Sequence, residues 1–235
     1  MAGVAILSNR QKAVLCLSGG MDSCVCAALA ARDYDVYALH FSYGQRTEAR
    51  ERRSAEAVAR LTGAKKFLPL KIDLFREIGG SALTDSTIAV PDAPEEESAI
   101  GRGEVPVTYV PFRNTHFLSA AVSWAEVLGA KRVVIGAVEQ DGSGYPDCRP
   151  AYYAAFNRLI AEGTKEGEIR VETPLIAMRK SEIVRLGVEV GAPFHVSWSC
   201  YSGEAEACGV CESCVLRQRA FREAGIADPV PYRVA

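Results

Sequence analysis

The stretch Ser18-Gly19-Gly20-Met21-Asp22-Ser23 constrains the fold of this chain more than any other segment. It follows an apolar run from Lys12 to Leu17 and leads into an apolar helical pattern from Ser23 to Arg32. Short continuous apolar runs are typical of strands that are buried on both faces of a parallel sheet. A strand, a glycine turn and a helix in direct succession place the turn at the carboxyl edge of the sheet, where the helix N-terminus attracts anions. We therefore expect an α/β fold with an anion-binding loop at residues 18–23.

The same alternation of strand and helix patterns continues along most of the chain. Further strands are predicted at 35–41, 65–72, 132–136 and 169–172. Further helices are predicted at 45–61, 115–128, 150–162, 180–190 and 213–223. Repeated strand and helix units of this kind imply a doubly wound, five-stranded parallel sheet with helices on both faces.

The chain length and two irregular segments define the expected domain organisation. With 235 residues, one large domain, or one domain with an appendage, is the expected size. We expect an α/β domain at 1–195 and a small, helical, metal-binding appendage at 196–235, where the alternation stops. The segment 79–110 is rich in Pro, Ser and Glu, and an irregular segment of that length is typical of a functional loop near an active site.

Charge and hydropathy exclude several functional classes. Lys and Arg total 27 against 29 for Asp and Glu, and this net charge of −2 gives no general attraction to nucleic acid or to an anionic membrane. The longest apolar run, Cys24 to Ala31, is too short to span a bilayer, and residues 1–11 do not have the pattern of a signal peptide. We therefore expect a cytoplasmic protein, in which eight cysteines indicate metal binding, catalysis or packing rather than disulfides.

The glycine loop has the chemistry of a pyrophosphate site. Its glycines allow successive N–H groups to converge on an anion, and Ser23 adds a hydroxyl at the helix start. The loop lacks the Gly-x-Gly-x-x-Gly pattern of dinucleotide folds and the lysine of NTPases that transfer a γ-phosphate. A plain turn capped by Ser23 is the alternative interpretation. Asp22 has two interpretations as well, as a contact to Mg²⁺ or ribose and as a helix cap.

A cluster of cysteines near the C-terminus predicts a structural metal site. Cys200, Cys208, Cys211 and Cys214 fall within fifteen residues and contain two Cys-x2-Cys spacings. Zinc takes four thiolates in a closed tetrahedral site. An iron–sulfur cluster, or a set of buried or redox cysteines, is the alternative.

The segment 136–149 (GAVEQDGSGYPDCR) follows a predicted strand, so it lies at the same sheet edge as the glycine loop. Its carboxylates, Glu139, Asp141 and Asp147, can accept hydrogen bonds from a polar heterocycle, and Arg149 can hold a carboxylate in a bidentate pair. A solvated turn is the alternative interpretation of this segment.

Several motifs together resemble known families. The loop at 18–23 is similar to the SGGxDS loop of the ATP pyrophosphatase family. Over about residues 12–219, the chain resembles one particular family more specifically, the 7-cyano-7-deazaguanine synthases. The motifs that carry this narrower resemblance are FSYGQR (41–46), VPFRN (110–114), SGYPDCR (143–149), ETPL (172–175), KSE (180–182) and the cysteine cluster.

The resemblance implies a fold, cofactors and site residues. It implies a sheet like that of the adenine nucleotide α-hydrolases, ATP with Mg²⁺, structural Zn²⁺, and 7-carboxy-7-deazaguanine and ammonia as substrates in 7-deazapurine (queuosine-type) biosynthesis. ATP-binding residues would be Leu17, Ser18, Gly19, Gly20, Met21, Asp22, Ser23 and Lys180. Substrate-binding residues would be Tyr43, Arg46, Arg113, Asn114, Glu139, Asp141, Ser143, Tyr145, Asp147 and Arg149. The metal ligands would be Cys200, Cys208, Cys211 and Cys214.

Three departures and three competing functions remain at this stage. The resemblance leads us to expect Asp at Ser42, Gly at Phe112 and a bulky residue near Gly142. Arg46 opens a charge-rich segment, for which a solvated helix face is the alternative to a ligand contact. The competing functions are an amide-forming ligase, a tRNA-thiolating ATP pyrophosphatase and a zinc-ribbon nucleic-acid module. We expect no nucleic-acid or membrane partner, and a homodimer is compatible with the sequence.

Overall fold

The computed structural model describes residues 10–94, 105–139 and 144–233. Within them the strands are β1 (Lys12–Cys16), β2 (Asp35–Ser42), β3 (Lys66–Lys71), β4 (Arg132–Ile135) and β5 (Arg170–Glu172). The α-helices are α1 (Met21–Asp33), α2 (Glu48–Leu61), α3 (Leu74–Ile78), α4 (Arg113–Leu128), α5 (Pro150–Gly163), α6 (Lys180–Glu189) and α7 (Glu212–Ala224). Two short 3-10 helices are η2 (Pro146–Cys148) and η3 (Phe194–Val196).

The strands form one parallel sheet in the order β3-β2-β1-β4-β5. In the register of β1, Ala13 lies between Val36 of β2 and Arg132 of β4. The chain winds outward from β1 to one edge and then from β4 to the other, so the winding reverses between these two strands. Ligands of open α/β sheets bind in the crevice at such a reversal, beyond the carboxyl ends of the strands. The doubly wound, five-stranded sheet predicted from the sequence is confirmed.

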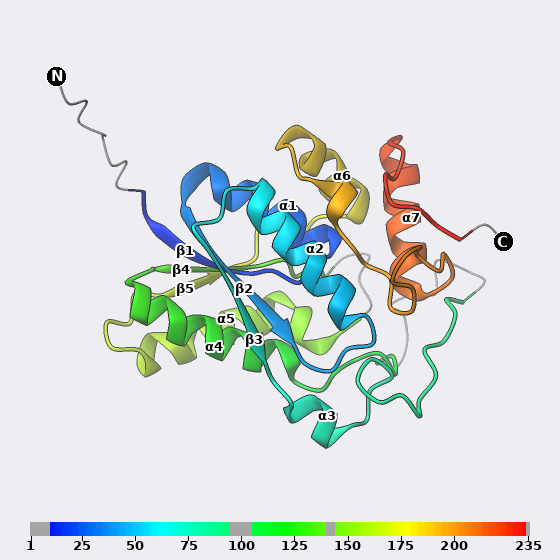
Figure 1. Ribbon diagram of the computed structural model, residues 1–235. Coiled ribbons are helices and arrows are strands. Elements are labelled where there is room, and N and C mark those ends of the chain that lie inside the picture. Colours follow the sequence, from blue (N-terminus) through cyan, green and yellow to red (C-terminus); the bar gives the residue numbers. More distant parts are fainter. Residues whose placement is uncertain (1–9, 95–104, 140–143, 234–235) are drawn as a thin grey trace.

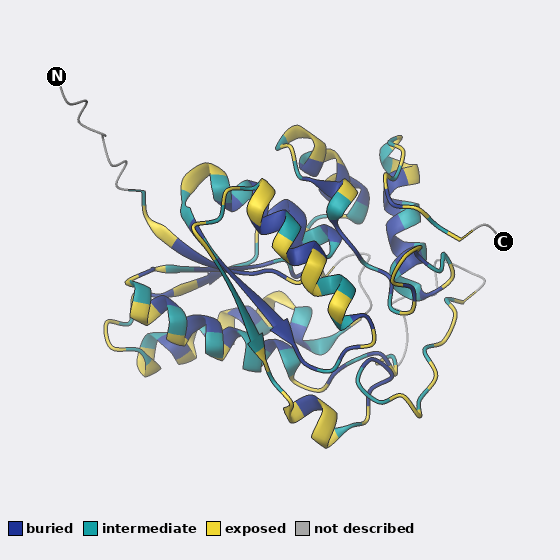
Figure 2. Cartoon of the chain, in the orientation of Figure 1, coloured by how far each residue is buried: buried dark blue, intermediate teal, exposed yellow. Residues whose placement is uncertain are grey.

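Helices cover both faces of the sheet, with α1 and α2 on one side and α4 and α5 on the other (Figure 1). Val14 of β1 lies in a buried cluster with Leu118 of α4, whereas its neighbour Leu15 lies in a second cluster with Val25 of α1 and Val58 of α2. Successive strand residues point to opposite faces, so burial of both faces accounts for the unbroken apolar run in β1. Figure 2 shows this burial along the sheet and on the inner sides of the helices.

The helices and strands expected from the sequence are present, with ends that differ by a few residues. Helix α2 begins at Glu48 rather than at Gln45, because the Gln45 side chain holds the turn before the helix. Its Oε1 accepts the N–H of Tyr43 at 2.8 Å, and its Nε2 donates to the carbonyl of Phe41 at 3.1 Å. Helix α3 was not expected, since five residues are too few for a periodic signal.

The C-terminal part packs on the sheet domain through α7. Ala220 and Phe221 of this helix belong to the same buried cluster as α1 and α6. The division into a domain at 1–195 and an appendage at 196–235 stays a prediction.

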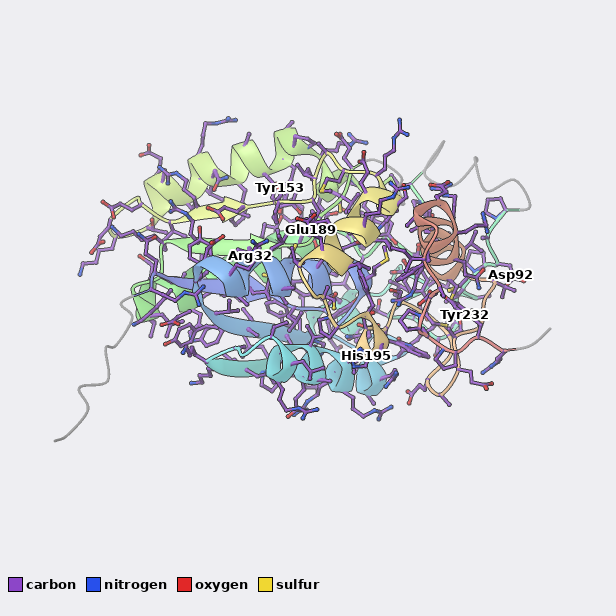
Figure 3. All side chains as sticks on the ribbon, turned by 90° about the horizontal axis from the view of Figure 1, so that it is seen from above. Arg32, Asp92, Tyr153, Glu189, His195 and Tyr232 are labelled. Carbon is purple, nitrogen blue, oxygen red and sulfur yellow. The ribbon has the colours of Figure 1, made fainter. Side chains whose placement is uncertain are left out.

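The described parts of the segment 79–110 run along the cysteine-rich end of the molecule. Asp92 forms an isolated antiparallel bridge with Cys211. Figure 3 shows Asp92 and Tyr232 at this same end, beside α7. None of the described helices has both the length and the hydropathy that crossing a bilayer requires.

Candidate active site

The glycine loop after β1 is pressed between α2 and the end of β4. Gly19 has a φ of +90°, and a Cβ atom there would lie 2.7 Å from backbone atoms of Glu51 and Ala55. Only glycine fits a left-handed position so close to another backbone. A Cβ atom on Gly136 would lie 2.9 Å from the backbone nitrogen of Ser23. These two close approaches fix the loop at the point where the winding of the sheet reverses.

Hydroxyl and amide groups converge inside the loop. The Ser23 Oγ lies 3.0 Å from the Ser18 Oγ and accepts the N–H of Gly19 at 3.1 Å. The Ser18 Oγ in turn accepts the N–H of Gly20 at 3.2 Å. Helix α1 begins directly after Gly20, so these donors stand at the positive end of the helix dipole. The arrangement is able to bind a pyrophosphate group.

Three adjoining cavities of about 230, 160 and 180 Å³ open around this loop. The first two share Ser18, Ser23, Tyr43, Glu51, Arg113 and Gly136. The first and the third share Met21, Asp22, Arg113, Gly136, Tyr145, Ser199, Tyr201 and Ser213. The cavities therefore connect the carboxyl edge of the sheet with the cysteine-rich segment.

Most residues predicted to bind ATP surround these cavities. The lining includes Leu17, Ser18, Gly20, Met21, Asp22, Ser23 and Lys180. Gly19 lies in the same loop but does not line them, because it packs against α2.

Lys180, at the start of α6, forms an ion pair with Asp22 of α1. The Lys180 Nζ lies 2.6 Å from the Asp22 Oδ2, and the two side chains are only 12% and 22% exposed. The Asp22 Oδ1 is buried and has no hydrogen-bond partner in the described part of the chain. Asp22 lies in the first turn of α1, and its contact to Mg²⁺ or ribose stays a prediction.

The residues predicted to bind the substrate fall into three groups. Tyr43, Arg46, Arg113, Asn114 and Tyr145 line the cavities. Glu139, Asp147 and Arg149 do not line them, and Glu139 and Arg149 are exposed. Asp141 and Ser143 lie outside the described residues.

Arg113 and Tyr43 form a polar pair inside the first two cavities. The Arg113 Nη1 donates to the Tyr43 hydroxyl at 2.9 Å. Burial raises the pKa of Tyr43 to about 12, so the phenol is neutral at physiological pH. The Arg113 Nε is buried with no acceptor among the residues that the structure describes.

Arg46 has a role that neither sequence interpretation anticipated. Its Nε donates to the carbonyl of Ala82 at 2.7 Å, and its Nη2 donates to the carbonyls of Asp85 at 3.2 Å and Ile88 at 2.6 Å. The guanidinium thus fastens the first part of the segment 79–110 beside the first cavity. A contact from Arg46 to the substrate stays a prediction.

The departures from the resemblance have different structural settings. Phe112 has a φ of +58° and is the one non-glycine residue with a positive φ in the described part of the chain. The glycine expected at this position suits a left-handed backbone, and the Phe112 side chain is 56% exposed. Ser42 is buried at the end of β2 and lines none of the three cavities. Gly142 lies outside the described residues.

Several cavity residues were missed by sequence reasoning. Glu51 was not singled out, because its segment carries many charges at helical spacing. Ser199, Tyr201 and Ser213 were missed too, although they stand next to cysteines of the predicted metal site. Their place beside those cysteines is the signal that would have found them.

The four C-terminal cysteines come together as expected. Their sulfur atoms all lie within 4.8 Å of one another. The Cys200 Sγ accepts the N–H groups of Ser202, Gly203 and Cys208 at 3.1–3.4 Å. Backbone donors around a sulfur favour the thiolate form, which is the form that binds metals. The cluster of Cys200, Cys208, Cys211 and Cys214 is therefore able to hold a metal ion.

The parallel sheet, with a glycine loop at the reversal of its winding, defines an α/β fold, and the loop at 18–23 is similar in sequence to the SGGxDS loop of the ATP pyrophosphatase family. The model of the queuosine biosynthesis protein QueC family matches residues 12–225, and the chain belongs to this family. It is 74% identical over 224 residues to a 7-cyano-7-deazaguanine synthase of Acidobacterium capsulatum, with 95% of this chain and 97% of the relative covered. A protein of the same name from Koribacter versatilis is 63% identical, with 94% and 93% covered. Among solved structures, the chain is similar to an NH3-dependent NAD synthetase from Campylobacter jejuni, with 17% identity, a TM-score of 0.45, and 81% of this chain and 68% of that chain covered.

Proposed function

We propose that this enzyme is an ATP-dependent carbon–nitrogen ligase that converts 7-carboxy-7-deazaguanine and ammonia to 7-cyano-7-deazaguanine. The observation that carries the proposal is the 74% identity, over nearly the whole of both chains, to a relative named 7-cyano-7-deazaguanine synthase. The polar loop beside connected cavities supports it, because the reaction needs a pyrophosphate site next to a site for an acid.

In the proposed reaction the substrate carboxylate attacks the α-phosphorus of ATP. Pyrophosphate leaves into the loop at 18–23, where Ser18, Ser23 and the glycine amides receive it. Ammonia then displaces AMP to form an amide. A second ATP adenylates the amide oxygen, and loss of AMP with a proton leaves the nitrile. The chain contributes positioned hydrogen-bond donors rather than a covalent nucleophile.

We assign the remaining polar groups of the site by their chemistry. Lys180 and the free donor of Arg113 would face developing negative charge on the substrate or the phosphates. The carboxylates predicted at 139, 141 and 147 would accept hydrogen bonds from the guanine-like ring, and Arg149 would pair with a carboxylate.

Two metals fit the residues present. The four cysteines would hold zinc, since four thiolates in Cys-x2-Cys spacing form a closed structural site. The buried, unpaired Oδ1 of Asp22 would be a ligand of Mg²⁺. When bound, Mg²⁺ would neutralise part of the phosphate charge.

The same proposal includes the substrates, the partners and the cellular location of the enzyme. Free ammonia and a small heterocyclic acid would be its substrates, with no nucleic-acid or membrane partner. We place the enzyme in the cytoplasm, where a reducing environment keeps metal-binding thiols unoxidised. The product would enter 7-deazapurine (queuosine-type) biosynthesis.

Mass spectrometry of the product tests the proposal. The purified enzyme is incubated with ATP, Mg²⁺, an ammonium salt and 7-carboxy-7-deazaguanine. The expected product is the nitrile, with two AMP and two pyrophosphate formed for each product molecule. An end product heavier by one water would identify an amide-forming ligase, and accumulation of ADP would exclude attack at the α-phosphorus.

A further inference from the structure

Glu51 has a special position among the residues that line the first two cavities. Among the residues that the structure describes, it is the one carboxylate that the two cavities share. Its own backbone carbonyl packs against Gly19, so the side chain rises from α2 directly beside the phosphate loop. Arg113, across the shared wall, lines both cavities as well.

The hydrogen-bond donors to the Glu51 carboxylate are neutral groups. Its Oε1 accepts the Thr47 hydroxyl at 2.9 Å, and its Oε2 accepts the side-chain amide of Gln45 at 3.1 Å. Asp22, the other carboxylate of the first cavity, is instead bound to the ammonium group of Lys180. A carboxylate with neutral partners keeps its capacity to take up a proton, whereas a carboxylate in a close ion pair loses much of it.

The surroundings of Glu51 shift its pKa in both directions. Burial raises its pKa, whereas the two hydrogen bonds and the guanidinium of Arg113 lower it, and Glu48 on the same helix raises it. The net direction is upward. Tyr43, which faces it from the end of β2, is neutral. A raised pKa brings a carboxyl group nearer to the value that suits proton transfer at neutral pH.

The proposed reaction creates a need for such a group. In water near neutral pH, ammonia is mostly ammonium, whose nitrogen has no free electron pair for attack. A partly buried carboxylate next to the adenylated acid would attract the cation and remove its proton.

We propose that Glu51 binds the incoming ammonium ion and accepts its proton before the nitrogen attacks the adenylated substrate, an inference that rests on the proposed function. One N–H bond of ammonium breaks, and the proton goes to the Glu51 carboxylate. The nitrogen then forms a bond to the acyl carbon, the bond from that carbon to the AMP oxygen breaks, and AMP leaves with the electron pair. The second proton, released as the amide forms, leaves with AMP. Glu51 is thereby a catalytic residue for the amide-forming step only, and not for either adenylation.

Three assays on the Glu51→Gln variant separate this role from others. Exchange of labelled pyrophosphate into ATP, dependent on the acid substrate, reports adenylation without ammonia. Product formation with ammonium chloride reports the complete reaction. Formation of a hydroxamate with hydroxylamine reports attack by a nucleophile that is mostly unprotonated at neutral pH and needs no such base.

The expected result is a selective loss. Product formation with ammonium falls by about 10²-fold or more, which is the usual contribution of a general base, whereas exchange and hydroxamate formation stay within about threefold of the unmodified enzyme. Glu56→Gln, which removes an exposed carboxylate from the same helix, is the matched control and leaves all three rates unchanged.

Several outcomes would overturn the inference. An equal loss in all three assays would mean that Glu51 holds the nucleotide, its Mg²⁺ or the fold. An unchanged rate with ammonium would show that it accepts no proton. If Glu51→Gln does not fold, Glu51→Asp keeps a shortened carboxylate, and it must lower the ammonium rate more than the hydroxamate rate. If the unmodified enzyme shows no exchange dependent on the acid, the proposed function fails, and this step fails with it.

Discussion

The Asp147 Oδ2 accepts the backbone N–H of Asn114 at 3.1 Å, so a carboxylate predicted to bind the substrate also holds the start of α4. Asn114 returns the contact, since its Nδ2 donates to the carbonyl of Asp147 at 3.0 Å. The second carboxylate oxygen, Oδ1, is buried and without a partner in the described part of the chain. Burial raises the pKa of Asp147. One oxygen therefore serves the fold, and a contact from the other oxygen to the substrate stays a prediction.

Asp147→Asn is expected to weaken substrate binding and leave ATP binding unchanged. The amide oxygen of Asn can still accept the N–H of Asn114, while its NH2 replaces the free acceptor with a donor that faces ring N–H groups. An unmatched buried pair of this kind costs about 1–3 kcal/mol, or roughly 5- to 150-fold in the dissociation constant. Calorimetric titration with each ligand measures this. Unchanged substrate affinity would leave Asp147 only its contact to α4.

Removal of one partner of the Asp22–Lys180 pair is expected to destabilise the protein. Lys180→Met leaves Asp22 without a cation in a setting that is mostly buried, so the free energy of unfolding should fall by roughly 1–3 kcal/mol, less than for a fully buried pair. Adding Asp22→Asn should restore part of the loss, because the unpaired charge is removed as well. Urea unfolding of the two single variants and the double variant measures the coupling. Strictly additive losses would show that the two side chains do not stabilise each other in solution.

Loss of one cysteine of the metal cluster is expected to release the metal and lower the melting temperature. Cys208→Ser removes one of the four sulfur ligands, and the energy of metal binding contributes to folding. Elemental analysis by mass spectrometry should give one zinc per chain before the substitution and much less after it. Cys26→Ala, a buried cysteine of α1 away from the cluster, should keep the metal. A Cys208→Ser variant with full metal content and unchanged melting would contradict the assignment.

His40 is expected to make the stability of the protein depend on pH. Its ring is buried, its Nδ1 donates to the carbonyl of Leu17 at 3.0 Å, and burial lowers its pKa below the ordinary value of 6.5. The unfolded chain therefore binds a proton first as the pH falls, and the stabilisation present above pH 6.5 is lost as the pH passes down through the pKa of the folded state.

His40→Gln removes this titration while keeping a donor near the Leu17 carbonyl. The free energy of unfolding, measured by urea titration from about pH 7.5 to about pH 5.5, should fall more steeply in the unmodified protein than in the variant. Glu51 and Asp147 have raised pKa values, which act in the opposite direction, but they are common to both proteins. Parallel curves would mean that His40 titrates alike in the folded and unfolded states.

Features that depend on local pattern were predictable from the sequence. The order of strands and helices followed from apolar periodicity, and the glycine loop followed from its place between a strand and a helix. The cysteine cluster followed from spacing, because Cys-x2-Cys brings two sulfurs together over a single turn.

Features that depend on packing between distant segments could not be predicted in this way. Arg46 donates to three backbone carbonyls between residues 82 and 88, and a carbonyl acceptor has no sequence signature. Likewise, Glu48, Glu51 and Glu56 look alike in a charge-rich helix, and only the packing of α2 against Gly19 selects Glu51 for the cavities. Residues of this kind are fixed by tertiary neighbours rather than by their own neighbourhood in sequence.

The place of Cys200 affects how mutagenesis of this enzyme has to be interpreted. Its two chain neighbours, Ser199 and Tyr201, both line the cavities, and Ser213 stands between the last two cysteines of the cluster. A substitution that disturbs the cluster therefore moves the cavity wall through the peptide bonds that join them. The inactivity of a cysteine variant would consequently not show whether the metal takes part in the chemistry. Variants of Ser199 or Ser213 that keep the metal report the effect of the cavity wall separately from the effect of metal loss.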